Sequence, residues 1–408
     1  MLTGSSGEIS ETMLRPSTSI PKRARGPLWR DPQVRSLVIQ TVLLIALVGV
    51  IMLMIHNTMA NLQARGINTG FAFLDYRAGF SIAQTLNDYS SNSSYGDAFL
   101  AGLYNTLLVS ILGIIASTVV GLVVGIARLS PNWLLARVAT VYIEIFRNIP
   151  LLLQILFWYF AALGALPQLR QSLSLFDLFF LNQRGMIIPA PILGEGFSAT
   201  VYGLLAAVVL AWGLARMNKK RQAETGQRLP IGWINLGVIV VIPLVIFLIS
   251  GSPLSWSVPE LVGFNYRGGL HMIPELIGLW VALTIYTASF IAEIVRSGIQ
   301  SVSHGQTEAA SSLGLPKGIT MRKVIMPQAM RLMIPQLSSQ YLSLTKNSSL
   351  AIAIGYPDLF AVFGNTTMNQ TGQAVEIMAI TMGVYLALSL ITSLLMNLFN
   401  SRMALKER

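Results

Sequence analysis

The stretch EAASSLGLPKGITMRKVIMP, residues 308–327, lies between two long apolar segments of the chain. Residues 308–312 are compatible with a helix, residues 313–316 (LGLP) interrupt it, and residues 321–324 resume helical character. Because Gly and Pro interrupt helices, this pattern predicts a bent pair of short helices rather than one continuous helix. The stretch and its surroundings are rich in cations, which predicts a cytoplasmic position: Lys317, Arg322, Lys323 and Arg331.

The composition is that of a polytopic membrane protein. Of the 408 residues, 53% are hydrophobic and only 11% are charged, whereas about one quarter of a soluble domain is charged. The net charge of +11 does not indicate a nucleic-acid partner, because the cations gather in loops on one side of the apolar segments. We therefore expect the chain to lie in a lipid bilayer.

The residue types that carry most catalytic and metal chemistry are scarce. The chain has no Cys and three scattered His, which excludes disulfides and thiol catalysis and leaves no predicted metal site. No acidic pair lies inside an apolar segment, and the phosphate-binding pattern G-x-x-x-x-G-K-[ST] is absent. We therefore predict neither a membrane-embedded enzyme nor an ATPase.

Apolar segments that approach the roughly 20 residues needed to cross a bilayer recur along the chain. Each such span must satisfy its own backbone hydrogen bonds, which predicts helices and hence an all-α polytopic membrane protein. The cation-rich loops alternate consistently with both termini in the cytoplasm and with the loop at about 57–96 in the periplasm. The eight predicted spans lie at about 37–56, 98–127, 138–165, 197–215, 233–250, 273–298, 332–356 and 375–399.

Small residues and proline shape two of these spans. Gly121 and Gly125 form a G-x-x-x-G pattern, which lets two helices approach closely, and we assign it to packing. Pro150 is predicted to bend the third span.

Two E-x-x-R patterns lie near the cytoplasmic ends of spans: Glu144 with Arg147, and Glu293 with Arg296. Residues three apart share a helix face, so each pair can interact. We favour structural ion pairs near a gate, and direct gating is the alternative.

Lys346 lies inside a predicted span, where an ionisable side chain costs about 2.5–3.5 kcal/mol on insertion scales. One interpretation gives it a substrate carboxylate or a gating contact. The other gives it a partner carboxylate, a backbone carbonyl or a position at the membrane interface. Asn347, Ser348 and Ser349 follow directly, and they either line the same polar path or bond across helices.

The spacing of the opening stretch resembles the EAA loop of ABC-importer membrane subunits. The matching residues are Glu308, Ala309, Ala310, Gly314, Val324, Met326 and Pro327, with Val324 in place of the usual Ile and Met326 in place of the usual Leu. The resemblance implies a coupling loop at about 304–327 that docks into a cleft of a cytoplasmic ATPase subunit. ATP and Mg²⁺ are then bound by that partner, and this chain is expected to hold no cofactor.

Further matches narrow the resemblance to polar amino-acid importers: Asn105-Thr106, the pattern from Glu144 through Arg147 and Pro150 to Gln154, and residues 346–350. The resemblance covers roughly residues 98–400 and implies a five-helix type I importer core. The inserted pair at about 197–250 is similar to the larger permease subunit of general L-amino-acid importers of Gram-negative bacteria. The implied division is a basic cytoplasmic tail at 1–36, a first span and periplasmic loop at 37–97, a permease domain at 98–400 and a cytoplasmic tail at 401–408.

The implied function is that of a permease subunit in the bacterial inner membrane, which moves L-amino acids by ATP-driven rocking of its helix bundle. The implied partners are ABC ATPase subunits, a second and different permease subunit, and a periplasmic amino-acid-binding protein. The alternative is a self-sufficient, ion-coupled secondary transporter, a class that typically has two similar halves with paired helix breaks. The sequence contains no second copy of the coupling pattern, which favours the importer.

Overall fold

A computed structural model describes residues 32–64, 70–227 and 230–403, and the chain divides into two units between Thr69 and Gly70. The first unit contains α1 (Pro32–Ala64), whose apolar part, Val34–Thr58, is long enough to cross a bilayer. The predicted first span lies inside this helix. The helix begins at Pro32, and residues 1–31 of the predicted tail lie outside the described residues.

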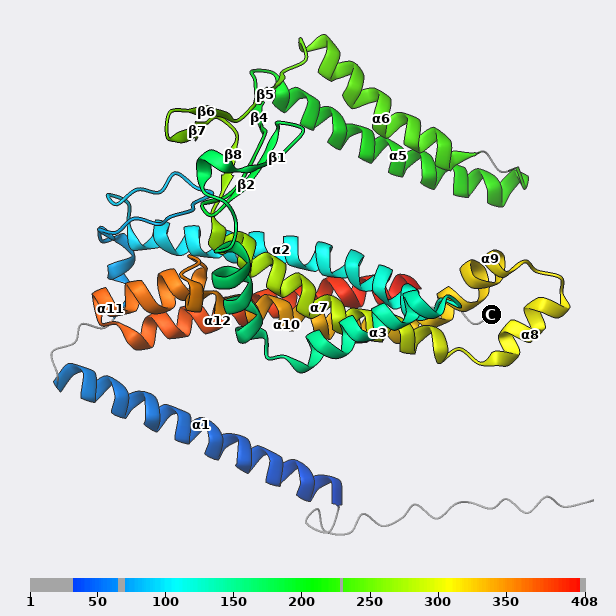
Figure 1. Ribbon diagram of the computed structural model, residues 1–408. Coiled ribbons are helices and arrows are strands. Elements are labelled where there is room, and N and C mark those ends of the chain that lie inside the picture. Colours follow the sequence, from blue (N-terminus) through cyan, green and yellow to red (C-terminus); the bar gives the residue numbers. More distant parts are fainter. Residues whose placement is uncertain (1–31, 65–69, 228–229, 404–408) are drawn as a thin grey trace, which may run out of the picture. The chain divides into compact units, whose positions relative to one another are not determined.

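The second unit is built around a helix bundle (Figure 1). Its long helices are α2 (Tyr95–Arg128), α3 (Trp133–Asn148), α7 (Pro274–Gln300), α10 (Met326–Asn347) and α12 (Ala374–Met403). Helices α2 and α10 pack along α7, and α12 packs against α10. Helix α7 is the central one, because 67% of its apolar window is buried, against 28% for α2.

The glycines of α2 bring it close to α7, as the G-x-x-x-G pattern predicted. A Cβ atom at Gly121 would lie 2.6 Å from Cβ of Ile291, and one at Gly125 would lie 2.8 Å from the carbonyl oxygen of Ala292. Neither position has room for a larger residue without movement of the helices. The packing role is confirmed.

The third predicted span is broken, as Pro150 predicted. Helix α3 ends at Asn148, and the chain continues as α4 (Leu151–Leu156) and the π-helical η3 (Phe157–Leu163) after a bend of 106°. The side-chain amide of Gln154 donates hydrogen bonds of 2.9 Å to the carbonyl oxygens of Phe146 and Ile149. Gln154 therefore satisfies backbone groups that the break releases, which is needed in an apolar surrounding.

The count of eight spans is not confirmed. Six helices in the described part of the chain pass as candidate spans by length and hydropathy, and the bent pair α3–α4/η3 makes a seventh. The predicted span at 332–356 is not among them. Its residues form α10, which holds Arg331, Pro335 and Lys346, and the chain then changes to a 3₁₀ segment, η6 (Ser348–Ile354).

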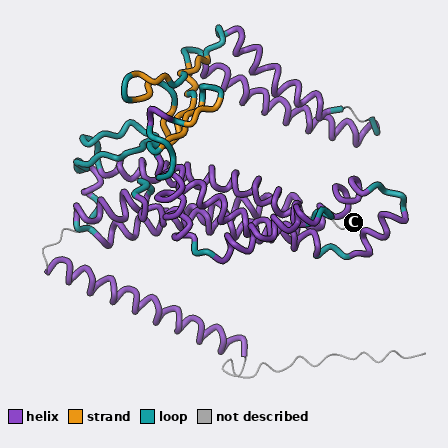
Figure 2. The backbone as a smooth tube through the Cα atoms, viewed as in Figure 1, coloured by secondary structure: helices purple, strands orange, loops and turns teal. Residues whose placement is uncertain are grey.

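The two segments that connect predicted spans at about 166–196 and 251–272 contain β-structure, and we call them together the β-lobe (Figure 2). One antiparallel sheet has the order β1-β2-β3-β8, and two further pairs are β4-β5 and β6-β7. The strands are β1 (Leu173–Leu175), β2 (Phe179–Asn182), β3 (Gly185–Ile188), β4 (Ala190–Leu193), β5 (Leu254–Ser257), β6 (Glu260–Val262), β7 (Asn265–Arg267) and β8 (Leu270–Met272). The rings of Tyr266 and Phe180 pack against each other at a tilt of 37°, with 4.6 Å between their centres, so the lobe has its own small core.

The inserted helices α5 (Phe197–Thr225) and α6 (Ile231–Ile249) pack against each other. The buried positions of α5 are Gly203, Ala207 and Ala211, at a spacing of four residues that lets two helices approach closely. The remaining elements are η2 (Ala72–Asp75), η4 (Leu169–Gln171), α8 (His304–Ser312), α9 (Lys317–Thr320), η5 (Met321–Ile325), η7 (Phe360–Thr367) and α11 (Met368–Thr371).

Candidate functional site

The stretch from 304 to 327 forms the predicted bent pair of short helices. Helix α8 ends at Ser312, and Gly314 follows with a positive φ of 71°. The N–H of Leu315 donates to the carbonyl of Ala310 at 3.0 Å, and that of Gly314 donates to the carbonyl of Ser311 at 2.9 Å. These two bonds make a Schellman motif, which ends a helix with a left-handed residue, usually glycine. The sharp turn therefore depends on Gly314.

The other motif residues divide into anchors and exposed positions. Ala310 is only 3% exposed, and Met326 packs against the buried cluster formed by α7 and α10. Glu308 and Ala309 are exposed on α8, and Leu313 is 79% exposed at the turn. A short helix held by buried anchors thus presents a separate exposed surface. Val324 and Pro327 are half-buried where the chain joins α10.

Of the two predicted ion pairs, Glu293–Arg296 forms, whereas Glu144 lies near Arg128 in place of Arg147. Glu293 accepts from Arg296 and also from Arg128 at the end of α2, each at 2.5 Å. Glu144 does not pair with Arg147. Its carboxylate lies 3.9 Å from Arg128 and is 58% exposed. Arg128 therefore joins the two patterns, because it lies between α3 and α7 at the end of a long helix.

Arg147 packs its guanidinium over the ring of Phe290, 5.2 Å from the ring centre. Both residues line a hollow of about 310 Å³ between α3, α7 and α10. Glu293 also lines it, together with Ile294, Ser297, Gln336, Ser339 and Gln340. The structure thus brings both E-x-x-R patterns to one polar region.

Lys346 and its neighbours lie elsewhere, at the point where α10 becomes the 3₁₀ segment η6. The Lys346 side chain is exposed. The hydroxyl of buried Ser348 donates to the carbonyl of Thr345, and that of Ser349 donates to the carbonyl of Lys346, both at 2.8 Å. The two serines therefore bond to backbone carbonyls three residues earlier, in the last turn of α10, and neither of these bonds crosses to another helix. Asn347 is the last residue of α10.

A buried polar contact between α2 and the segment before η7 was not predicted as a site. The side chain of Asn105 donates to the carbonyls of Pro357 and Gln84, at 2.9 and 2.8 Å. The hydroxyl of Thr106 accepts from the N–H of Leu359 at 2.9 Å. The available signal was that Asn105 and Thr106 match the pattern of polar amino-acid importers. Two of the partners, Pro357 and Leu359, lie about 250 residues away and were not predictable.

The same segment holds a buried carboxylate. Asp358 is 0% exposed and accepts from the N–H of Ala361 at 2.8 Å and from the hydroxyl of Tyr385 at 3.1 Å. The hydroxyl of Tyr356 donates to the carbonyl of Asn105 at 3.0 Å. Asp358 is therefore satisfied by partners from η7 and α12, which fits a structural role. Across residues 32–64, 70–227 and 230–403, no three His, Cys, Asp or Glu side chains lie together as a metal site.

A family model described as "Binding-protein-dependent transport system inner membrane component" matches residues 199–405, which include the coupling segment and helices α7, α10 and α12. The chain belongs to this family. The matched range holds every residue of the EAA-type pattern, so the family assignment and the geometry of the bent helices agree.

Relatives in this transport family match nearly the whole chain. The protein YhdX of Escherichia coli K12, named as an amino-acid ABC transporter permease, is 54% identical over 380 residues, or 93% of this chain and 97% of the relative. The general L-amino acid transport system permease AapQ of Rhizobium johnstonii is 50% identical and covers 93% of this chain and 94% of its own length. The glutamate/glutamine/aspartate/asparagine transport system permease BztB of Rhodobacter capsulatus is 41% identical and covers 93% and 96%.

As a member of this transport family, the chain is a membrane-spanning permease component of the ABC transporter type. Both relatives align with 93% of this chain, so the similarity extends well beyond residues 199–405. This assignment favours the importer over a secondary transporter.

Proposed function

We propose that this chain is a permease subunit of an ATP-driven, binding-protein-dependent importer that carries L-amino acids across a bacterial inner membrane. The observation that carries the proposal is the coupling segment, in which the turn at Gly314 holds exposed α8 beside buried anchors. The amino-acid substrate class follows from the names of relatives that share 54% and 50% of aligned residues.

The exposed side of α8 is the proposed contact with an ATPase subunit. A short helix suits a groove, where a few apolar side chains give most of the affinity. Leu313 is the apolar side chain proposed to enter the groove of the ATPase, because it is 79% exposed. Glu308 and Ala309 are exposed on the same short helix, α8. The partner binds ATP and Mg²⁺, and its closure moves α8 and hence α7 and α10.

The polar region around Glu293 is the proposed cytoplasmic gate. Arg128, Glu144 and Arg147 reach it from α2 and α3, while Glu293 and Arg296 lie on α7, which leads directly into α8. Movement of α8 would therefore pull on the ion pairs. We place Lys346, Asn347 and Ser349 on the polar path, where exposed Lys346 faces a substrate carboxylate or the second permease subunit. Buried Ser348, bonded to the carbonyl of Thr345, supports this segment from inside the bundle.

The proposed topology keeps both termini in the cytoplasm. It requires α10 as an additional crossing, and its 22 residues span about 33 Å at 1.5 Å each. Helix α10 packs against both α7 and α12, and the second permease subunit is proposed to cover the side chains that stay exposed in this chain, Lys346 among them. The β-lobe joins the start of α7, and the coupling segment follows its end. In this topology α7 crosses the membrane, so the β-lobe faces the periplasm when the coupling segment lies in the cytoplasm. A binding protein reaches that side, and a second, different permease subunit completes the path.

Reconstitution in proteoliposomes tests the proposal. Uptake of labelled L-amino acids is measured with the full complex, and again with ATP, the ATPase or the binding protein left out. We expect uptake only with all three. Uptake by this chain alone under an ion gradient, without the ATPase, would instead establish the secondary transporter.

A further inference from the structure

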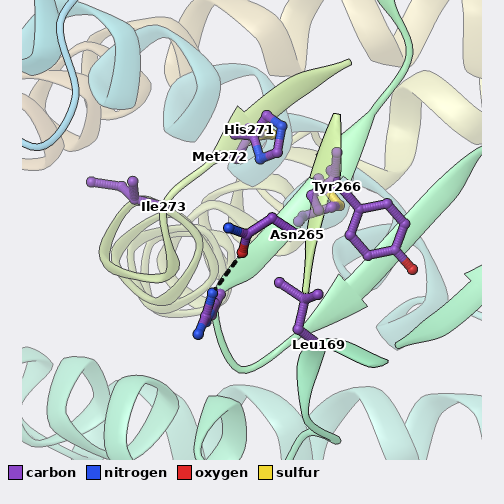
Figure 3. A pocket seen from close by; sticks show the side chains of 9 residues that line it. Leu169, Asn265, Tyr266, His271, Met272 and Ile273 are labelled. Carbon is purple, nitrogen blue, oxygen red and sulfur yellow. Dashed lines mark hydrogen bonds between the residues drawn. The ribbon is translucent and has the colours of Figure 1, made fainter. Parts of the chain in front are cut away.

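The β-lobe carries two adjoining hollows that the transport cycle proposed above does not use. The first, of about 350 Å³, lies where strands β3, β7 and β8 meet η4 (Figure 3), and it is lined by Leu169, Arg184, Met186, Ile187, Asn265, Tyr266, His271, Met272 and Ile273. The second, of about 410 Å³, is lined by Gln168, Leu169, Arg170, Gln183, Arg184 and Phe264. The two hollows share Leu169 and Arg184, so they form one continuous surface.

Both arginines of this surface are held by uncharged partners. The guanidinium of Arg184 donates to the side-chain oxygen of Asn265 at 2.9 Å, the bond drawn as a dashed line in Figure 3. Arg170 lies over the ring of Phe264, 4.1 Å from its centre. These contacts fix each guanidinium in place and leave its charge without a counterion.

The charges of the β-lobe are segregated. Residues 166–196 and 251–272 contain three acidic residues, Asp177, Glu195 and Glu260, and three arginines, Arg170, Arg184 and Arg267. Two of the arginines line the hollows, and none of the described residues that line either hollow is Asp or Glu. The β-lobe thus has equal numbers of acidic residues and arginines, but the recess formed by the two hollows is positively charged.

We propose that this recess is a docking site for an acidic surface loop of the periplasmic binding protein. A guanidinium binds a carboxylate through two parallel hydrogen bonds, and Arg170 and Arg184 both keep donors free for such a contact. The inference rests on the proposed function, because it needs both a binding protein and a β-lobe in the periplasm.

The recess fits the carboxylate of a protein side chain better than a free amino acid. A free amino acid carries an ammonium group as well as a carboxylate, and an anionic side chain is the partner that balances the ammonium charge. Neither hollow is lined by an acidic side chain. An Asp or Glu side chain on a protein surface brings only the negative charge, which the recess complements.

The experiment measures how uptake by the reconstituted complex depends on the concentration of the binding protein that supports wild-type uptake. In the variant R170M/R184M we expect the half-saturating concentration to rise by about tenfold at low salt, with maximal uptake retained, because charge pairs at a rim act mainly on association. Its salt dependence should also become flatter. The variant R170K/R184K, which keeps the charges, should lie within about threefold of the wild type.

Arg267→Met is the matched control, since Arg267 is an exposed arginine of strand β7 that lines neither hollow. It should leave the half-saturating concentration unchanged. An unchanged value in R170M/R184M overturns the docking site. A second outcome also overturns it: free L-amino acid competes with the binding protein for the wild-type complex, and this competition is lost in Arg184→Met. The recess would then bind the free amino acid. If wild-type uptake needs no binding protein at all, the proposed function itself fails, which is a different result.

A labelling experiment on introduced cysteines tests the docking site without the arginine variants, so it does not depend on whether those variants fold. The chain has no cysteine, so Gln168→Cys at the recess and Ser174→Cys on β1 each introduce a single thiol at an exposed position. The binding protein should protect the thiol at 168 from a membrane-impermeant maleimide and leave the one at 174 reactive. Equal labelling at 168 with and without the binding protein counts against docking.

Discussion

Arg128 and Glu293 form an ion pair with 2.5 Å between the guanidinium nitrogen and the carboxylate oxygen, and they tie the end of α2 to α7 across 165 residues of sequence. Arg296 donates to the same carboxylate. Because both side chains of the Arg128–Glu293 pair are less than a quarter exposed, a lost partner is not simply replaced by water.

Glu293→Gln is therefore expected to destabilise the bundle, since it leaves Arg296 without its carboxylate partner and leaves Arg128 with only the exposed Glu144 at 3.9 Å. We expect a loss of about 1–3 kcal/mol, measured as a lower unfolding temperature in detergent. The matched control is Glu144→Gln, because Glu144 is 58% exposed and 3.9 Å from Arg128. An exposed pair of this kind contributes about 0–1 kcal/mol. Equal unfolding temperatures for the two variants would contradict the central position of Glu293.

Gly125→Ala tests the close approach of α2 and α7. The added Cβ would lie 2.8 Å from both the carbonyl oxygen of Ala292 and Cβ of Val295, which belong to a helix that has no room to yield. We expect a loss of about 1–3 kcal/mol in thermal unfolding. Gly113→Ala is the control, because its Cβ meets only the end of the Leu344 side chain at 3.2 Å. A variant at 125 that is as stable as the one at 113 would refute tight packing there.

Thr106→Val tests the polar contact that holds the segment before η7 against α2. Valine has nearly the same shape but cannot accept the N–H of Leu359, which is left unpaired in a buried site. We expect a loss of about 1–3 kcal/mol and faster proteolysis near residue 359. In the control Thr140→Val, the lost bond is only to the carbonyl of Ala136 in the same helix. The contact is unimportant if both variants lose equal stability.

The features that sequence predicted are those with local causes. The bend after Pro150, the turn at 313–316 and the close packing at Gly121 and Gly125 each follow from the shape of one or two residues. The partner of Arg128 has no such signal. Arg128 pairs closely with Glu293 and only distantly with Glu144. The packing of α2, α3 and α7 decides this, and no local pattern specifies it.

The β-lobe and α10 show two further limits. The strands are three or four residues long and occur in segments with mixed apolar and turn residues, so no period of two was visible. Helix α10 carries Arg331 and Lys346, and its hydropathy is too low for the span criterion. Hydropathy measures transfer into lipid, so it does not select α10, whose apolar side chains pack instead against α7 and α12.

Gly314→Ala tests whether the coupling segment depends on the backbone conformation of its turn. An alanine at a φ of 71° is strained by about 1–2 kcal/mol, although its Cβ would meet no atom within 4 Å. The Schellman turn should therefore distort without any clash, and α8 should lose its fixed direction. We expect weaker association with the ATPase and slower ATP-driven uptake, with insertion into the membrane unchanged.

Gly318→Ala is the matched control, four residues away in α9. Its Cβ would also meet no atom within 4 Å, but its backbone is helical, so alanine should be neutral or slightly stabilising. Both variants add one methyl group to the same exposed segment and differ only in backbone conformation. If uptake falls equally in both, the surface of the segment matters and its turn does not. If uptake falls in neither, the ATPase docks elsewhere, and the function proposed for α8 is wrong.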